Sequence, residues 1–151
     1  GSVIVSKILL DITDRLKDIA ENIIYLVKEP EINQSIMLPE MFSFSQKMLR
    51  RSLRIYVDQN IEGAAGVCTQ DAKIDEAYSS FKEEIIRIVQ DNPRLINRGS
   101  MLLDISRSIE EISDFATQII ETTCYILMAK HYKCYDDELH EFSLEIFDEY
   151  Q

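Results

Sequence analysis

The sequence predicts an all-α protein, an antiparallel helical bundle, and three observations support this prediction. Apolar residues recur at alternating steps of three and four, the spacing of one face of an α-helix. Only four glycines and three prolines occur in the 151 residues, too few for the many turns of an all-β fold. With 46% hydrophobic and 28% charged residues, a chain of this length can bury the core of one compact domain.

A first helix is expected within residues 3–29. Its apolar residues form a nearly uninterrupted helical seam, and the Glu29-Pro30 pair marks its end, because the residue before a proline avoids the α region. The seam residues are Leu9, Ile12, Leu16, Ile19, Ile23 and Leu26.

Two further helices are expected between Pro39 and Asn92. The second helix begins after Pro39, which suits a first-turn position. Whether this helix continues past Gly63 and Gly66, through a kink or a close helix contact, remains open. The third helix is expected to begin at Asp71 as its N-cap and to stop near Asn92-Pro93.

The fourth helix has the most regular apolar spacing, which runs from Leu102 to Ile126 after a start at Gly99-Ser100. A short acidic helix is expected from about Asp137 to Tyr150, docked on the bundle by a few apolar residues. No strand-like alternation competes with the helical pattern anywhere.

Charge and cysteine usage exclude several classes of protein. The formal charge of −11 and pI of about 4.6 argue against nucleic-acid binding, which needs a basic face. No stretch approaches the roughly 20 apolar residues that cross a bilayer. Cys68, Cys124 and Cys134 form an odd count without C-x-x-C spacing, so reduced thiols are expected rather than a disulfide or a zinc site.

The first and fourth helices resemble copies of one another. A shift of 100 positions superimposes their apolar seams, and it also places Asp14 on Asp114 and Tyr25 on Tyr125. Matching polar positions indicate an internal repeat. The chain would then hold one complete three-helix unit preceded by only the last helix of an earlier unit.

These residues suggest a family. The run Met48–Leu53 is followed by acidic residues at Asp58, Asp71 and Asp75, and the fourth helix contains further matching residues. The latter are Arg107, Ile109, Glu110, Ile112, Asp114, Ala116, Thr117, Ile119, Glu121 and Tyr125. This pattern resembles the PhoU family, although Glu111, Ser113, Phe115, Gln118 and Ile120 depart from the family signature.

The resemblance implies a PhoU-like three-helix repeat at 39–131, with the last helix of a truncated first repeat at 3–29 and an acidic tail at 132–151. PhoU-like proteins are non-catalytic, cytoplasmic and often dimeric. They restrain the phosphate-starvation response by connecting the ATPase subunit of a phosphate transporter to a sensor histidine kinase, and they reach the membrane only through these partners.

The resemblance also implies a metal motif, E(D)-x-x-x-D. Glu110 and Asp114 satisfy it in the fourth helix, and Asp14 and Asp18 satisfy it in the first. The 100-residue shift instead places Leu10 opposite Glu110, and in that register the first site has lost one ligand. Residues four apart share one helical face, and carboxylates suit hard or borderline cations such as Mg, Mn, Zn or ferric iron. Weaker candidates are Glu121, Asp11 and Glu21.

A solvated acidic face is the alternative to a metal site. Asp71 and Asp75 are expected to be structural, as a cap and a first-turn acid.

Two other functions remain open. One is the cytoplasmic PhoU-like domain of a sodium–phosphate cotransporter, which requires membrane spans elsewhere in the gene. The remote one is a ferritin-like metal oxidase, for which Asp137-x-x-His140 is a single imperfect copy of the required Glu-x-x-His motif. No glycine-rich phosphate loop and no nucleophile with a base at recognisable spacing is present.

Overall fold

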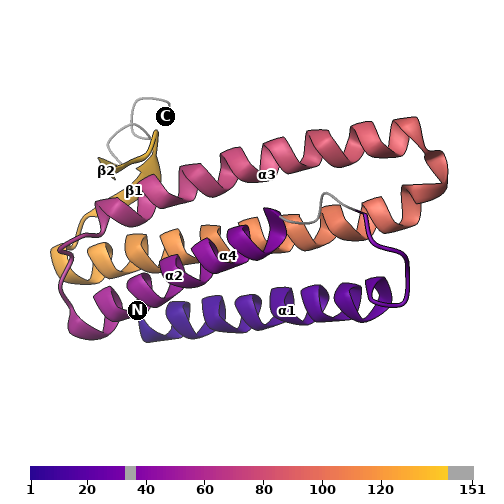
Figure 1. Ribbon diagram of the computed structural model, residues 1–151. Coiled ribbons are helices and arrows are strands. Elements are labelled where there is room, and N and C mark those ends of the chain that lie inside the picture. The colour runs from indigo at the N-terminus through magenta and orange to yellow at the C-terminus, as the bar shows by residue number, and fades with distance from the viewer. Residues whose placement is uncertain (33–36, 143–151) are drawn as a thin grey trace, which may run out of the picture.

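The computed structural model describes residues 1–32 and 37–142, where four α-helices run in alternating directions and form a bundle (Figure 1). The helices are α1 (Ser2–Leu26), α2 (Met37–Asp58), α3 (Ala65–Asp91) and α4 (Ile96–Met128), with a short 3-10 helix η1 (Pro93–Leu95) before α4. Two short strands follow, β1 (His131–Tyr135) and β2 (Glu138–Phe142). The all-α prediction is confirmed, with one small hairpin added.

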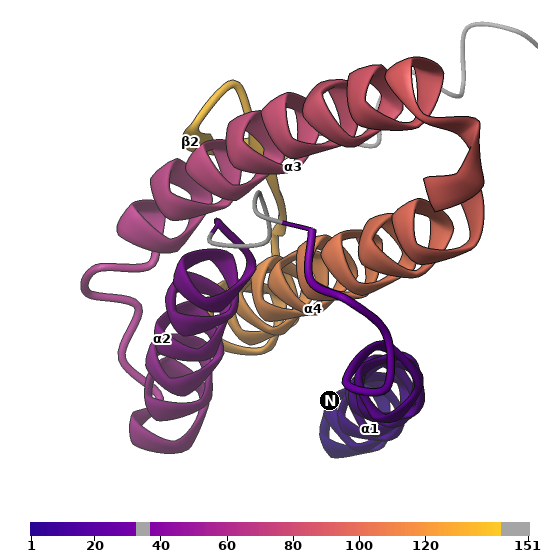
Figure 2. The same ribbon diagram turned by 45° about the vertical axis from the view of Figure 1, so that its right-hand side comes forward.

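Helix α4 is the centre of the bundle and packs against each of the other three helices (Figure 2). Its apolar seam is therefore covered from several sides, and Ile109, Ile119 and Ile120 are almost completely buried. Small residues let the neighbours approach closely: Ala116 is fully buried, and the Ser45 hydroxyl of α2 donates to the Ile109 carbonyl at 3.3 Å. The longest regular apolar seam in the sequence thus belongs to α4, the helix that contacts each of the other three.

Helix α1 packs on α4 alone among the described helices and buries only one side. Val5, Ile8, Ile12 and Ile19 face α4 and are buried. Other seam residues stay open: Leu9 and Leu16 are 38% and 42% exposed. The residues 100 positions later, Ile109 and Ala116, are 1% and 0% exposed. The seam positions that a shift of 100 residues superimposes are thus buried in α4 and partly exposed in α1.

The second and third helices are separated by a loop rather than joined through a kink. Helix α2 ends at Asp58, and α3 begins at Ala65, six residues before the expected N-cap at Asp71. The capping prediction for Asp71 is therefore wrong, because this residue lies well inside α3. The Asn60 side-chain oxygen accepts a hydrogen bond from the Glu62 amide at 2.9 Å, which provides the turn before α3.

Gly63 and Gly66 allow a matched test of this loop. A Cβ at Gly63 would lie 2.5 Å from a terminal nitrogen of Arg51, and Gly63 also has φ of +82°. A Cβ at Gly66 would lie 3.0 Å from the same guanidinium, but the backbone of Gly66 is helical and suits any residue with a side chain. Because only Gly63 needs the left-handed region, Gly63→Ala is expected to lower the free energy of unfolding by about 1 kcal/mol or more. Gly66→Ala is expected to be close to neutral in the same urea titration, and equal losses in both variants would contradict this explanation.

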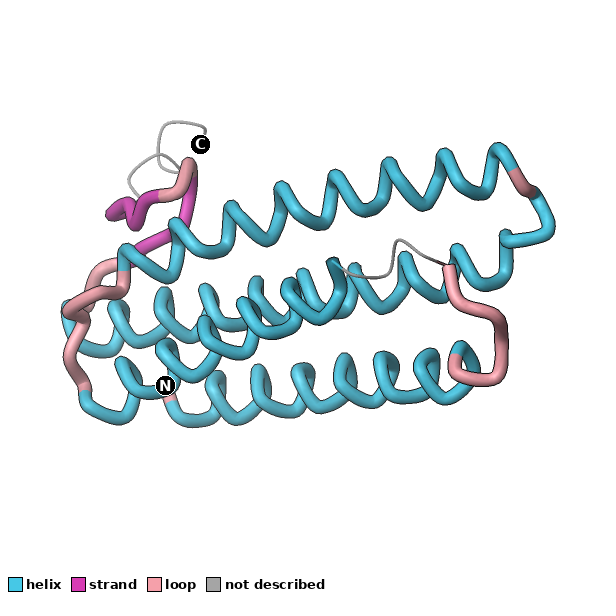
Figure 3. Tube along the Cα trace, in the orientation of Figure 1, coloured by secondary structure: helices cyan, strands magenta, loops and turns pink. Residues whose placement is uncertain are grey.

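The C-terminal region differs from the expected acidic helix. Strands β1 and β2 pair antiparallel, with Tyr135 opposite Glu138 (Figure 3). Asp136 and Asp137 form the two-residue turn with φ of 47° and 64°, a conformation that aspartate tolerates and that closes hairpins. The helix prediction is wrong for residues 137–142, and residues 143–150 of the expected helix lie outside the described residues.

The cysteines also differ from expectation. Cys68 near the start of α3 and Cys134 in β1 form a disulfide with an S–S distance of 2.04 Å, while Cys124 is a buried free thiol. The sequence predicts reduced thiols at all three positions, and the structure has one only at Cys124. The sequence does not reveal this pairing, because the two cysteines lie 66 residues apart and meet only when the hairpin folds back onto α3.

Candidate functional site

Four carboxylates lie on the neighbouring helices α3 and α4, close enough for their charges to act on one another. Asp71 and Asp75 lie four residues apart on α3, and Glu110 and Asp114 lie four residues apart on α4. Each pair occupies one helical face, and the two helices pack in opposite directions (Figure 1). We call these four residues the acidic cluster. The structure therefore places Glu110 and Asp114 near Asp71 and Asp75, which the sequence analysis interprets as a helix cap and a first-turn acid.

Burial and mutual repulsion favour the protonated forms within the acidic cluster. Burial, followed by the charges of Asp75 and Asp114, raises the pKa of Asp71 to about 7. Burial and the charge of Asp114, with smaller contributions from Asp75 and Asp71, raise the pKa of Glu110 to about 7. The pKa values of Asp75 and Asp114 are also raised, first by burial and then by neighbouring acids. A cation placed among these groups would reverse the repulsion.

Asp71 supplies an unpaired acceptor at this position. Its Oδ1 atom is buried and accepts no hydrogen bond, although buried polar atoms are normally paired. The oxygen-only donor set fits Mg, Mn or ferric iron. Within residues 1–32 and 37–142, however, no three His, Cys, Asp or Glu side chains already converge closely enough to hold a metal ion. The residues fit a cation chemically, and binding would require their side chains to turn toward one another.

Glu121 extends the acidic face of α4 but already has partners. Its carboxylate accepts a hydrogen bond from Lys133 Nζ at 3.0 Å and another from the Cys134 amide at 3.1 Å. Both donors belong to β1 of the hairpin. Glu121, a weaker metal candidate from sequence, therefore anchors the hairpin in this structure.

The acidic residues of α1 lie apart from the acidic cluster. Asp18 pairs with Arg15 at 3.1 Å, and Arg15 in turn donates to Glu111 of α4 at 2.9 Å. Glu21 lies 3.9 Å from Lys17. None of the groups that shift the pKa values of the acidic cluster belongs to α1. Asp11, Asp14, Asp18 and Glu21 thus form a separate acidic row on a different helix.

The two histidines lie on the hairpin. His131 stacks on Tyr125 with ring centroids 4.6 Å apart, and His140 Nε2 lies 3.7 Å from a Glu138 carboxylate oxygen. Asp137 is in the turn and His140 in β2, so they do not form a helical motif that projects into a bundle core. Asp137 and His140 therefore do not form the helical arrangement that a ferritin-like oxidase requires.

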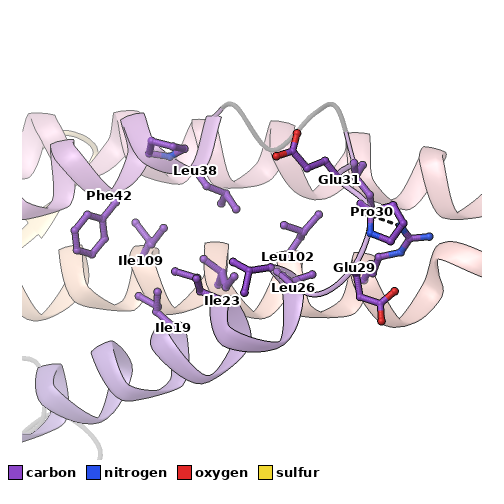
Figure 4. Close-up of a pocket in the computed structure, with 15 residues that line it drawn as sticks. Ile19, Ile23, Leu26, Glu29, Pro30, Glu31, Leu38, Phe42, Leu102 and Ile109 are labelled. Carbon is purple, nitrogen blue, oxygen red and sulfur yellow. Dashed lines mark hydrogen bonds between the residues drawn. The ribbon is translucent and has the colours of Figure 1, made fainter.

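An apolar cavity of about 680 Å³ opens between α1 and α2, above α4 (Figure 4). Ile19, Ile23 and Leu26 of α1 face Phe42 of α2 across it, and α4 forms its floor. The rim holds Arg98, whose guanidinium donates to the Pro30 carbonyl at 2.7 Å. The described lining is mostly apolar, and it contains none of the acidic residues that the sequence proposes as metal ligands.

Comparison with known proteins identifies the family. The PhoU domain matches residues 38–123, more than half of the chain. The chain belongs to the PhoU domain family. No described helix is both long enough and apolar enough to cross a membrane.

Curated PhoU relatives match over most of this chain. A protein of Thermotoga maritima named phosphate-specific transport system accessory protein PhoU homolog 2 is 36% identical over 89% of the chain and 57% of its own length. PhoU homologs of Clostridium acetobutylicum and a Burkholderia species are 29% and 27% identical over 82% of the chain. These names describe accessory proteins of a transport system rather than enzymes, in agreement with the non-catalytic expectation. The chain spans between 55% and 58% of the length of these three relatives.

The PhoU match contains the whole acidic cluster and Glu121, whereas the acids of α1 and the hairpin lie outside it. Sequence reasoning found the α4 half of the cluster and overlooked the α3 half. One signal was available: Asp71 and Asp75 have the same four-residue spacing as Glu110 and Asp114. Locating the start of α3 at Ala65 would have placed both acids on a helical face instead of at a cap.

Proposed function

We propose that this chain is part of a regulator of phosphate uptake and phosphate-starvation signalling. The observation that carries the proposal is the PhoU match over residues 38–123, supported by relatives whose names describe accessory proteins of phosphate-specific transport. The protein acts as a non-catalytic adaptor and restrains the starvation response when phosphate is plentiful.

The proposed partners are the ATPase subunit of the phosphate transporter and a sensor histidine kinase. The adaptor works in the cytoplasm as a homodimer and reaches the membrane only through these partners. The net charge of −11 makes nucleic acid an unsuitable partner.

Helix α1 is proposed to be the last helix of a first PhoU repeat, followed by a complete repeat at 39–131. Its seam matches that of α4 at an offset of 100 residues, yet Leu9 and Leu16 are open where Ile109 and Ala116 are covered. In α4 the equivalent positions are covered because α2 and α3 pack there. Two helices packed in the same way on α1 would bury its open face.

The acidic cluster is proposed to bind a divalent or ferric cation such as Mg, Mn, Zn or Fe. Glu110 and Asp114 would hold it from α4, and Asp71 and Asp75 from α3. The raised pKa values and the unpaired Asp71 oxygen support this proposal. The cation would neutralise the repulsion between the two helices and fix their packing. The pair Asp14 and Asp18 on α1 is a second candidate with the same four-residue spacing, although the offset of 100 residues places Leu10 rather than an acid opposite Glu110.

A phosphate-responsive reporter in the native host tests the regulatory role. Deletion of the full-length gene is expected to leave the reporter active in high phosphate, and the full-length gene supplied in trans is expected to restore repression. An unchanged reporter after deletion would overturn the proposal. The full-length gene also decides the alternative of a sodium–phosphate cotransporter domain, which requires membrane spans encoded in the same gene.

A further inference from the structure

The disulfide joins the C-terminal hairpin to the start of α3. Cys68 is buried in the first turns of α3, and Cys134 is half-buried in the middle of β1. Their Cα atoms lie 5.2 Å apart, within the usual range for a disulfide. This bond lies outside the PhoU match on the hairpin side, because the match ends at residue 123.

The other attachments of the hairpin to the bundle are noncovalent. Tyr132 and Leu139 pack against the core, His131 stacks on Tyr125, and Lys133 and the Cys134 amide bind Glu121. The Thr69 hydroxyl, at the exposed start of α3, donates to the Asp137 carbonyl at 3.0 Å. An isolated two-stranded hairpin is only marginally stable in water. The covalent link is therefore expected to decide whether the hairpin stays docked.

We propose that Cys68 and Cys134 form a reversible thiol–disulfide pair that fastens the C-terminal hairpin over the end of the acidic cluster. In the closed state, Lys133 and the Cys134 amide hold Glu121, and Asp137 lies close enough to Asp75 to act on its charge. Opening the pair releases the hairpin and removes these groups from α3 and α4. The inference does not depend on cation binding or on phosphate regulation.

Glutathione disulfide, a small-molecule oxidant, completes the chemistry of closure. The Cys134 thiolate attacks it and releases one glutathione thiolate, which leaves a mixed disulfide on Cys134. The Cys68 thiolate then attacks the Cys134 sulfur and displaces the second glutathione. Two protein thiols and one glutathione disulfide thus become one protein disulfide and two molecules of glutathione. Reduced glutathione reverses both steps, beginning at the more accessible Cys134 sulfur.

The proposal is tested on the full chain in glutathione buffers of increasing oxidation. After denaturing alkylation, we expect one free thiol, Cys124, in oxidising buffer and three in reducing buffer. Hydrogen exchange of the amides of residues 131–142 is expected to be at least about tenfold faster in the reduced protein, with exchange in the centres of α2 and α4 unchanged. Three free thiols at every buffer ratio, or equal hairpin exchange in both states, would overturn the proposal.

Two variants serve as matched controls. Cys134→Ser is expected to show fast hairpin exchange in both buffers, because it cannot close. Cys124→Ala removes the buried bystander thiol and is expected to keep the redox response, with zero and two free thiols at the two extremes. Slow hairpin exchange in Cys134→Ser would show that the other contacts suffice to hold the hairpin, and it would also overturn the proposal.

Discussion

The metal-free protein is expected to become more stable by roughly 3 kcal/mol when the pH is lowered from 8 to 5. Burial and neighbouring acids raise the pKa values of Asp71 and Glu110 to about 7, whereas carboxyls in an unfolded chain titrate near 4. Between these values the folded state binds more protons than the unfolded state. The stability contributed by these two groups is therefore fully present below about pH 4 and is lost as the pH rises through 7.

The expected change in stability is discounted because the carboxyl groups of Asp71 and Glu110 are partly exposed to solvent. Each pKa unit corresponds to about 1.4 kcal/mol, and solvent screening reduces the total for groups that are only half-buried. The measurement is a urea titration at several pH values in the presence of a chelator. Asp71→Asn/Glu110→Gln is expected to flatten most of the pH dependence, whereas Asp58→Asn, at the exposed end of α2, is expected to retain it. Stability that rises between pH 5 and pH 8 in the wild type would contradict this account.

Phe81→Ala is expected to lower the free energy of unfolding by about 3 to 5 kcal/mol. Phe81 lies on the inner face of α3, and its side chain is completely buried in the core that α4 shares with α2 and α3. Its truncation removes a large apolar side chain and leaves a cavity that neighbouring helices cannot fill. A loss of this size is a large fraction of the stability of a small domain.

The matched control for this prediction is Phe44→Ala. Phe44 lies on the outer face of α2, where about half of its side chain is exposed, and Lys47 lies over its ring. Its truncation is expected to cost less than about 1 kcal/mol. Equal losses for Phe81→Ala and Phe44→Ala in denaturant titrations would contradict the assignment of the core.

The periodicity of apolar residues predicted the helices well because buried side chains recur at regular helical spacing along each helix. The seam of α4 was read correctly from Leu102 to Ile126, and the break at Asn92-Pro93 lies where α3 gives way to η1. The start of α3 was missed because a small, weakly patterned segment precedes Asp71. Ala65, Gly66 and Thr69 give little hydrophobic signal, although Val67 and Cys68 are buried.

The candidate site was only half predictable. Glu110 and Asp114 stand out by spacing within one helix, but their neighbours on α3 depend on how two helices pack. The hairpin was missed for a related reason. A stretch rich in acids resembles a solvated helix, whereas the turn depends on two consecutive aspartates, Asp136 and Asp137, that accept positive φ. The disulfide then follows from the hairpin and has no local signal of its own.

The acidic cluster between α3 and α4 is the central claim, and calorimetric titration of the metal-free protein with Mn²⁺ at pH 7.5 tests it most directly. We expect saturable binding in the wild type and in Asp14→Asn/Asp18→Asn. Binding is expected to be lost in Glu110→Gln/Asp114→Asn and weakened about tenfold or more at pH 5, where protons compete for the same oxygens. No heat of binding in the wild type, or equal binding in both double variants at both pH values, would contradict a cation site at the acidic cluster.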